Sequence, residues 1–147
     1  MARSIIAVIV SYILMFVLNL LAFLGLYAVI GPGQAFRPRS YLASNRWILI
    51  TFVILVVTGV IAGLICAVIA RGGRAPAALA LGVVVIGILL AIPSVMKARS
   101  NAGMARPPEV SQMEALNYAY WPVWAPFVFP FVSALGVVVG GKLKKRS

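Results

Sequence analysis

Four long apolar blocks constrain the fold of this chain more than any other feature of its sequence. An α-helix rises about 1.5 Å per residue, so a block of some twenty residues can cross a hydrocarbon core of about 30 Å. We therefore expect an all-α membrane protein, with a single four-helix transmembrane bundle and short loops over residues 1–147. The expected spans are about 5–30, 48–70, 76–96 and 121–141.

The composition fits a chain with little surface in contact with water. Of its 147 residues, 63% are hydrophobic and 10% are charged, whereas about a quarter are charged in soluble domains. The net charge is +11, but the thirteen Lys and Arg residues lie at block edges or in connecting loops. There they can meet anionic lipid headgroups. The expected partners are therefore the lipid bilayer and its anionic headgroups, and no nucleic acid.

The distribution of basic residues predicts the orientation of the spans. The N-terminus, the second loop and the C-terminus share one side and hold 7 Lys and Arg residues, against 6 in the first and third loops. The Arg71 to Arg74 turn and the KLKKRS tail adjoin their spans, and Glu109 and Glu114 fall on the other side. We expect a multi-pass protein of the bacterial inner membrane with both termini cytoplasmic. The first apolar run is longer than a cleavable signal segment of roughly 7 to 15 residues, which predicts an uncleaved anchor.

Glycine pairs spaced four apart are the clearest packing signal in the sequence. Gly59 and Gly63 lie in the second block, and Gly136 and Gly140 lie in the fourth. Without side chains at such positions, two helix backbones can approach closely and gain dispersion contacts that lipid does not match. Internal packing of one bundle and a face for a homo-oligomer or a membrane-protein partner are both open. The similar runs GVIAG and GVVVG also make the two pairs of spans candidates for parallel pseudo-repeats.

Three polar residues within the apolar blocks are candidates for intramembrane contacts. Asn19 lies near the middle of the first block, and Thr51 and Thr58 lie in the second. An unpaired amide in hydrocarbon costs a few kcal/mol, so Asn19 should face protein. The preferred interpretation is an interhelical hydrogen bond with a threonine. The alternative is that these side chains line the path of a channel or transporter.

The segment before the fourth block combines a predicted helix with three regularly spaced prolines. Val110, Met113, Leu116 and Tyr120 recur at roughly helical spacing and predict a short interfacial helix. The prolines are spaced by four, and each would leave a carbonyl one turn earlier without its amide partner. A kinked helix entrance wetted by interfacial water is the preferred explanation, and a hinge or cation ligand the alternative. These prolines are Pro122, Pro126 and Pro130.

The chain offers few residues for catalysis. It contains no His, its acids are Glu109 and Glu114, and its one cysteine, Cys66, lies inside the second block. Metal-ligand spacings, phosphate-binding glycine loops and Ser/His/Asp sets are absent from the sequence. We therefore expect a non-catalytic protein without cofactor or metal, structural or accessory in role, that packs through small-residue helix faces. A small-solute channel or transporter is the alternative, and an enzyme that uses Glu109 or Glu114 at the membrane surface is a distant third.

Several runs of residues resemble a known class of protein. The run AFRPRSY after the first block, Trp47 at the start of the second, and VIARGGRAP after it are similar to small four-span integral membrane proteins of bacteria. The resemblance covers most of the chain and implies a membrane protein without implying an activity. Small multidrug exporters differ, because they need a carboxylate in the first span and residues 5–30 contain none.

Overall fold

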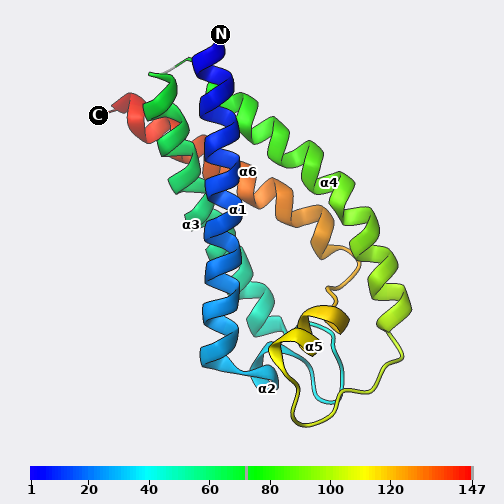
Figure 1. The fold of residues 1–147 in the computed structure, drawn as a ribbon. Coiled ribbons are helices and arrows are strands. Elements are labelled where there is room, and N and C mark those ends of the chain that lie inside the picture. The colour runs from blue at the N-terminus through cyan, green and yellow to red at the C-terminus, as the bar shows by residue number, and fades with distance from the viewer. Residues whose placement is uncertain (72, 147) are drawn as a thin grey trace.

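The computed structural model describes residues 1–71 and 73–146. Gly72, in the predicted turn between the second and third spans, and Ser147 lie outside the described residues. The described chain forms helices separated by turns and loops (Figure 1). In chain order these are α1 (Ala2–Ile30), α2 (Pro32–Ala35), α3 (Asn45–Ala70), α4 (Ala75–Asn101), α5 (Gln112–Tyr118) and α6 (Ala125–Arg146).

Four of these helices are long and apolar enough to cross a membrane. They are α1, α3, α4 and the Ala125–Lys145 part of α6. The predicted all-α, four-helix membrane architecture is therefore confirmed, and the chain is a multi-pass membrane protein. The short helix predicted before the fourth span is also present, as α5.

The ends of α3 follow from local hydrogen bonding. Ser44 precedes the helix, and its hydroxyl oxygen accepts a hydrogen bond from the Trp47 N–H at 3.2 Å, which satisfies a first-turn donor. At the other end Arg71 adopts the left-handed conformation (φ 56°), and its N–H donates back to the carbonyls of Ala67 and Val68. This capped end fixes the point at which the chain turns toward α4.

The fourth span begins later than the sequence indicated. The predicted span starts at Trp121, whereas α6 starts at Ala125. Pro122 therefore precedes the helix, Pro126 falls in its first turn, and only Pro130 lies inside it. The prediction that each proline leaves a carbonyl without its amide partner is therefore wrong for Pro122 and Pro126, because amides before the helix or in its first turn have no intrahelical partner to lose. Of these three prolines, only Pro130 removes an intrahelical amide, which leaves the carbonyl of Pro126 without its usual partner.

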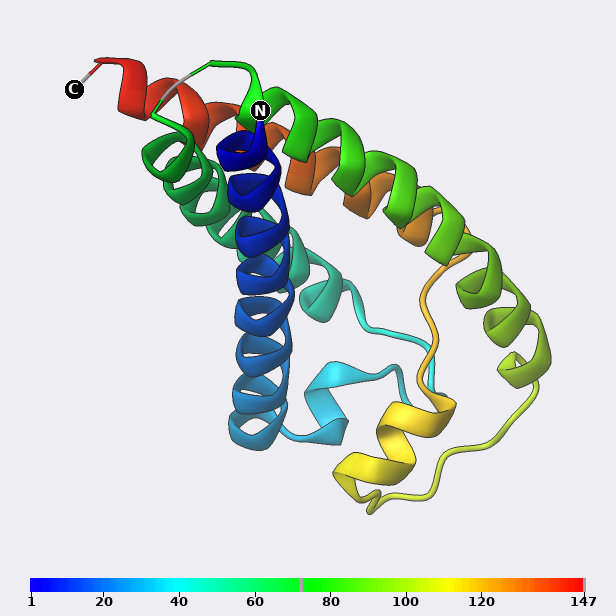
Figure 2. The ribbon, with the colours of Figure 1, turned by 45° about the horizontal axis from the view of Figure 1, so that its top comes forward.

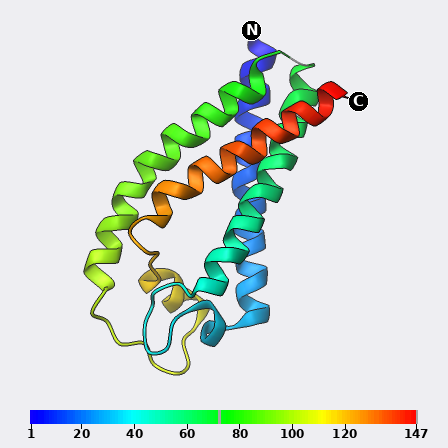
Figure 3. The same cartoon turned by 180° about the vertical axis from the view of Figure 1, so that it is seen from behind.

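The spans alternate in direction between two ends of the molecule. The start of α1, the end of α3, the start of α4 and the end of α6 gather at one end (Figure 1). Toward the other end, α4 diverges from α1 (Figure 2). From behind, α6 crosses between α4 and α3 on the face away from α1 (Figure 3). The most extensive helix contact is between α3 and α6, followed by α4 with α6 and α1 with α3.

The diverging ends of the spans are joined by a compact cap, formed by residues 31–44 and 102–124. The Arg106 N–H donates to the Arg39 carbonyl, and its Nε donates to the Ser40 carbonyl at 3.0 Å. The Tyr120 N–H donates to the Tyr41 carbonyl, and Asn101 Nδ2 donates to the Tyr118 carbonyl at 2.9 Å. These bonds connect the two cap segments to each other and to the end of α4.

Candidate functional site

The four glycines singled out in the sequence face one another where α3 crosses α6. A Cβ atom added to Gly59 would lie 2.6 Å from the Ser133 carbonyl oxygen, and one added to Gly136 would lie 2.6 Å from that of Val56. Both distances are shorter than real Cβ contacts. The two backbones are therefore too close to admit any side chain at these positions.

The second glycine of each pair is still more constrained. A Cβ on Gly63 would overlap the carbonyl of Val137, and one on Gly140 would overlap the carbonyl of Val60. The contacts made by Gly59 and Gly136 thus recur about one helical turn later at Gly63 and Gly140. At such distances the glycine Cα–H groups point toward carbonyl oxygens, a weak hydrogen bond common between closely packed helices.

Close packing continues from α6 onto α4. The Pro130 ring occupies the space where a Cβ of Gly87 would lie, and Pro76 does the same for Gly141, with its Cβ 2.6 Å away. By contrast, nothing lies within 4 Å of a Cβ added to Gly82. The glycines that pack tightly therefore do so inside this one chain, and their faces are already covered by its own helices.

Two of the three polar residues singled out in the sequence of the spans meet. Thr58 Oγ1 donates to Asn19 Oδ1 at 2.9 Å, with the Ile54 carbonyl as an alternative acceptor at 2.8 Å. Thr51 is 1% exposed, and its hydroxyl donates to the Trp47 carbonyl of its own helix at 2.8 Å. Asn19 and Thr58 thus link α1 to α3, whereas the Thr51 hydroxyl bonds within its own helix. The three do not line a common path.

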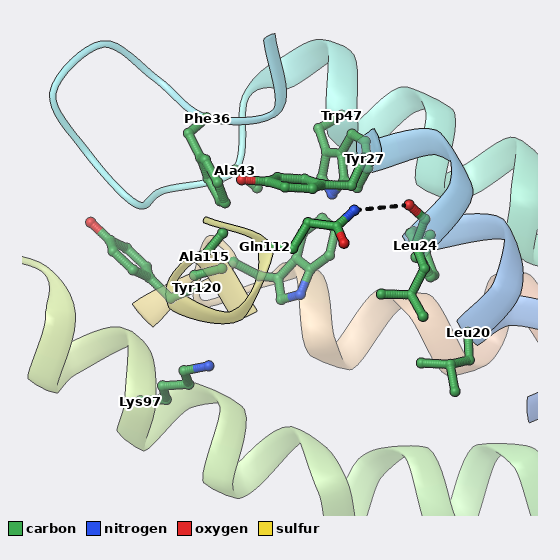
Figure 4. A pocket seen from close by; sticks show the side chains of 13 residues that line it. Leu20, Leu24, Tyr27, Phe36, Ala43, Trp47, Lys97, Gln112, Ala115 and Tyr120 are labelled. Atoms are coloured by element: carbon green, nitrogen blue, oxygen red, sulfur yellow. Dashed lines mark hydrogen bonds between the residues drawn. The ribbon is translucent and has the colours of Figure 1, made fainter. Parts of the chain in front are cut away.

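An apolar cavity lies between the cap and the spans α1, α3 and α4 (Figure 4). We call it the cap cavity, and its volume is about 350 Å³. Its aromatic walls contact one another edge-on, with the rings of Tyr27 and Trp47 6.4 Å apart and those of Tyr27 and Phe36 6.1 Å apart. The lining residues are Leu20, Phe23, Leu24, Tyr27, Phe36, Ala43, Trp47, Lys97, Gln112, Ala115, Ala119, Tyr120 and Trp121.

Lys97 gives the cap cavity its single charge among the described lining residues. Its side chain is half-buried and extends from α4 toward α5 (Figure 4). Across the cavity, Gln112 Nε2 donates to the Leu24 carbonyl at 3.5 Å and ties α5 to α1. Leu20 lines the cavity and is still 47% exposed. Leu20 therefore belongs both to the cavity wall and to the exposed surface of α1.

A second cavity, of about 260 Å³, continues into the spans. We call it the span cavity. Trp121 lines both cavities, so they adjoin at that side chain. The span cavity includes Asn19, Ser94 and Ser133 in an otherwise largely apolar wall. It is lined by residues of all four spans.

The two acidic residues have separate environments. Glu109 is exposed, whereas Glu114 accepts a hydrogen bond from the Tyr41 hydroxyl at 3.2 Å. Tyr41 is 2% exposed. Burial raises the pKa of Tyr41, and the neighbouring negative charge and hydrogen bond of Glu114 raise that pKa further. Glu114 thus connects α5 to the first loop. No group of three His, Cys, Asp or Glu residues that could hold a metal occurs in the described part of the chain.

Sequence reasoning missed the cap cavity. Its lining residues are dispersed along the chain. They come from α1, the first loop, α3, α4, α5 and the segment before α6. The available signal was that Tyr27, Phe36, Trp47, Tyr120 and Trp121 all flank spans on the same side of the membrane.

Comparisons with known proteins identify no relative of this chain. No protein-family model, curated protein or solved structure matches this chain.

Proposed function

We propose that this protein is a non-catalytic accessory protein of the membrane that holds a lipid-like amphiphile in the cap cavity. The observation that carries the proposal is the cavity itself, with aromatic and aliphatic walls and Lys97 as its charged group. Its volume of about 350 Å³ falls in the range of about 300–1,000 Å³ of small-molecule sites.

The hydrophobic effect alone cannot select a ligand here. An acyl chain that leaves the bilayer for the cap cavity exchanges one apolar environment for another and gains little from desolvation. Selectivity must come from dispersion contacts with the fixed aromatic walls and from the charge. The rings of Phe23, Tyr27 and Trp47 supply such walls, at centroid separations of 6.1 and 6.4 Å.

Lys97 favours a ligand with an anionic headgroup. An ammonium group beside an apolar cavity interacts more strongly with an anion than it would in water, because the local dielectric constant is lower. Lys97 lies near the cap end of α4, whereas Leu20 lies deeper along α1. A single-chain amphiphile would therefore place its carboxylate or phosphate near Lys97 and its tail along Leu20 and Leu24.

Tryptophan quenching tests this proposal directly. Trp47 and Trp121 line the cap cavity, whereas Trp124 is 52% exposed, so Trp124→Phe leaves fluorescence that reports mainly on the cavity. We expect a brominated long-chain fatty acid, added to this variant in detergent, to quench saturably and more than a brominated monoacylglycerol does. Quenching that rises linearly with the mole fraction of brominated fatty acid in the detergent micelles, without saturation, would refute a defined site.

A matched pair of variants tests the role of charge. Lys97→Gln should weaken fatty-acid binding about tenfold, since hydrogen bonds to charged groups contribute about 1.5–3 kcal/mol. Arg99→Gln, two residues on and exposed, should leave the affinity unchanged. Equal effects of the two substitutions would contradict a specific contact with Lys97.

The span cavity supports a second candidate, a small-solute channel or transporter. Asn19 and Ser94 place polar atoms in its wall, and such groups can replace part of a solute's hydration. The sequence places no Asp, Glu, His, Lys or Arg deep in the spans, which favours the accessory role. Liposomes with wild-type protein should show no uptake of small anions or cations above empty liposomes. Reproducible flux that Asn19→Leu abolishes would establish transport instead.

We also propose that the protein resides in a bacterial inner membrane with both termini cytoplasmic. The basic residues next to the ends of α3 and α6, and both acids in the cap, support this orientation. A periplasmic phosphatase fused after Ser147 should be inactive. High activity of the fusion would reverse the orientation.

A further inference from the structure

A third cavity lies at the end of the bundle opposite the cap. We call it the basic-end cavity, and its volume is about 440 Å³. The end of α3, the start of α4 and the end of α6 enclose it. Arg71, Lys144 and Lys145 contribute three cationic side chains to its lining.

Tight helix packing gives this cavity a fixed floor. Gly141 of α6 lies so close to α4 that an added Cβ would be 2.6 Å from the Cβ of Pro76. Ala67 and Val68 of α3 complete the apolar part of the lining. The basic side chains are thus mounted on the ends of α3 and α6, and close contacts of Gly140 with α3 and of Gly141 with α4 set the spacing of the helices there.

The electrostatic surroundings are positive. The chain's only acidic side chains, Glu109 and Glu114, lie in the cap at the far end. Arg74 precedes α4 and makes no side-chain cap, so the positive end of the helix dipole faces this region near Pro76. At the negative end of α3, Arg3 Nε donates to the Ile69 carbonyl at 2.8 Å, which offsets that carbonyl's charge.

We propose that the basic-end cavity binds the phosphate-bearing headgroup of an anionic phospholipid. Basic pockets between membrane spans bind such headgroups. The apolar floor at the level of the span ends suits the glycerol and first methylenes of a lipid, which inorganic phosphate and nucleic acid lack. This site is distinct from the cap cavity and does not rest on the function proposed for it.

Native mass spectrometry of the full chain in mild detergent measures this binding. The probes are dioctanoyl phosphatidylglycerol, dioctanoyl phosphatidylcholine and inorganic phosphate. We expect saturable phosphatidylglycerol adducts and few phosphatidylcholine adducts. Inorganic phosphate at equal concentration should not displace the phosphatidylglycerol. Displacement by phosphate, or by a short oligonucleotide, would overturn the assignment to a lipid.

A charge-matched pair of double variants localises the site. Lys144→Gln with Lys145→Gln should weaken phosphatidylglycerol binding about 30-fold, because each basic residue contributes about 1 kcal/mol to the attraction of an anionic headgroup. Arg39→Gln with Arg99→Gln removes the same charge from exposed positions on the cap side and should leave binding unchanged. Equal weakening by both pairs would overturn the site in favour of general charge attraction. Circular dichroism of each variant establishes that the helices persist, and Lys97→Gln should leave this binding intact.

Discussion

The α3–α6 crossing and the cap hold the same chain together by different means. At the crossing, Gly59 and Gly63 admit backbone atoms of α6 to distances that no side chain would allow. In the cap, hydrogen bonds, edge-on aromatic contacts and the Arg106 guanidinium, 5.7 Å from the centre of the Phe36 ring, connect two loops. The crossing depends on glycines that lack side chains, whereas the cap depends on polar and aromatic side chains.

This difference follows from the solvent at each depth. In hydrocarbon an apolar side chain gains little by leaving lipid for protein, so only closer packing favours association of helices. At the interface, water and headgroups satisfy irregular backbone, and loops can support polar networks. The crossing therefore tolerates no added atom, whereas the cap tolerates a cavity of about 350 Å³.

The largest expected effect comes from adding one methyl group at the crossing. Gly63→Ala should lower the free energy of unfolding by about 1–3 kcal/mol or more, because overpacking displaces the α6 backbone. Gly82→Ala is the matched control, with nothing within 4 Å of the added Cβ, and should raise stability by about 0.5–1 kcal/mol. Unfolding in increasing sodium dodecyl sulfate, followed by circular dichroism, measures both. Equal changes would remove the close-packing argument.

Removing the central cation of the cap should have the next largest effect. Arg106→Ala loses the hydrogen bond to the Ser40 carbonyl and the contact with Phe36, together about 1–3 kcal/mol. Limited proteolysis of the cap should accelerate while helix content persists. Arg99→Ala, at an exposed position, should leave the cleavage rate unchanged. Similar acceleration in both variants would show that the cap does not depend on Arg106.

A double-mutant cycle should detect a smaller coupling between α1 and α3. Asn19→Leu alone should change stability by no more than about 1 kcal/mol, because apolar packing replaces a modest hydrogen bond. Asn19→Leu combined with Thr58→Val should give a coupling energy of about 0.6 kcal/mol. The same cycle with Thr51→Val should be additive, since that hydroxyl bonds within α3. Coupling to Thr51 instead would contradict the assigned hydrogen bond.

The smallest expected effect is a pH dependence of the cap. The raised pKa of Tyr41 means that the folded protein keeps the phenol proton to higher pH than the unfolded chain. The resulting stabilisation is complete below the ordinary pKa of about 10 and is lost as pH rises through the folded value. The melting temperature should therefore fall as pH rises above about 10, and Tyr41→Phe should flatten this slope. An unchanged slope in the variant would assign the dependence to other groups.

The sequence by itself determined the four spans, because long uncharged runs can satisfy their backbone only as helices in a bilayer. It also located the glycines where close approach is feasible and the amide of Asn19 that must find a partner. These properties depend on residue type and spacing along one helix. They hold whichever helix lies alongside.

Only the tertiary structure decided which residues meet. It pairs Gly59 with Gly136, selects Thr58 over Thr51 as the partner of Asn19, and excludes Pro122 from the fourth span. It also assembles the cap cavity from segments far apart in the chain. Such contacts depend on helix crossing points and on the path of the loops. Hydropathy is nearly uniform around each span, so the sequence pattern carries little information about which face meets which neighbour.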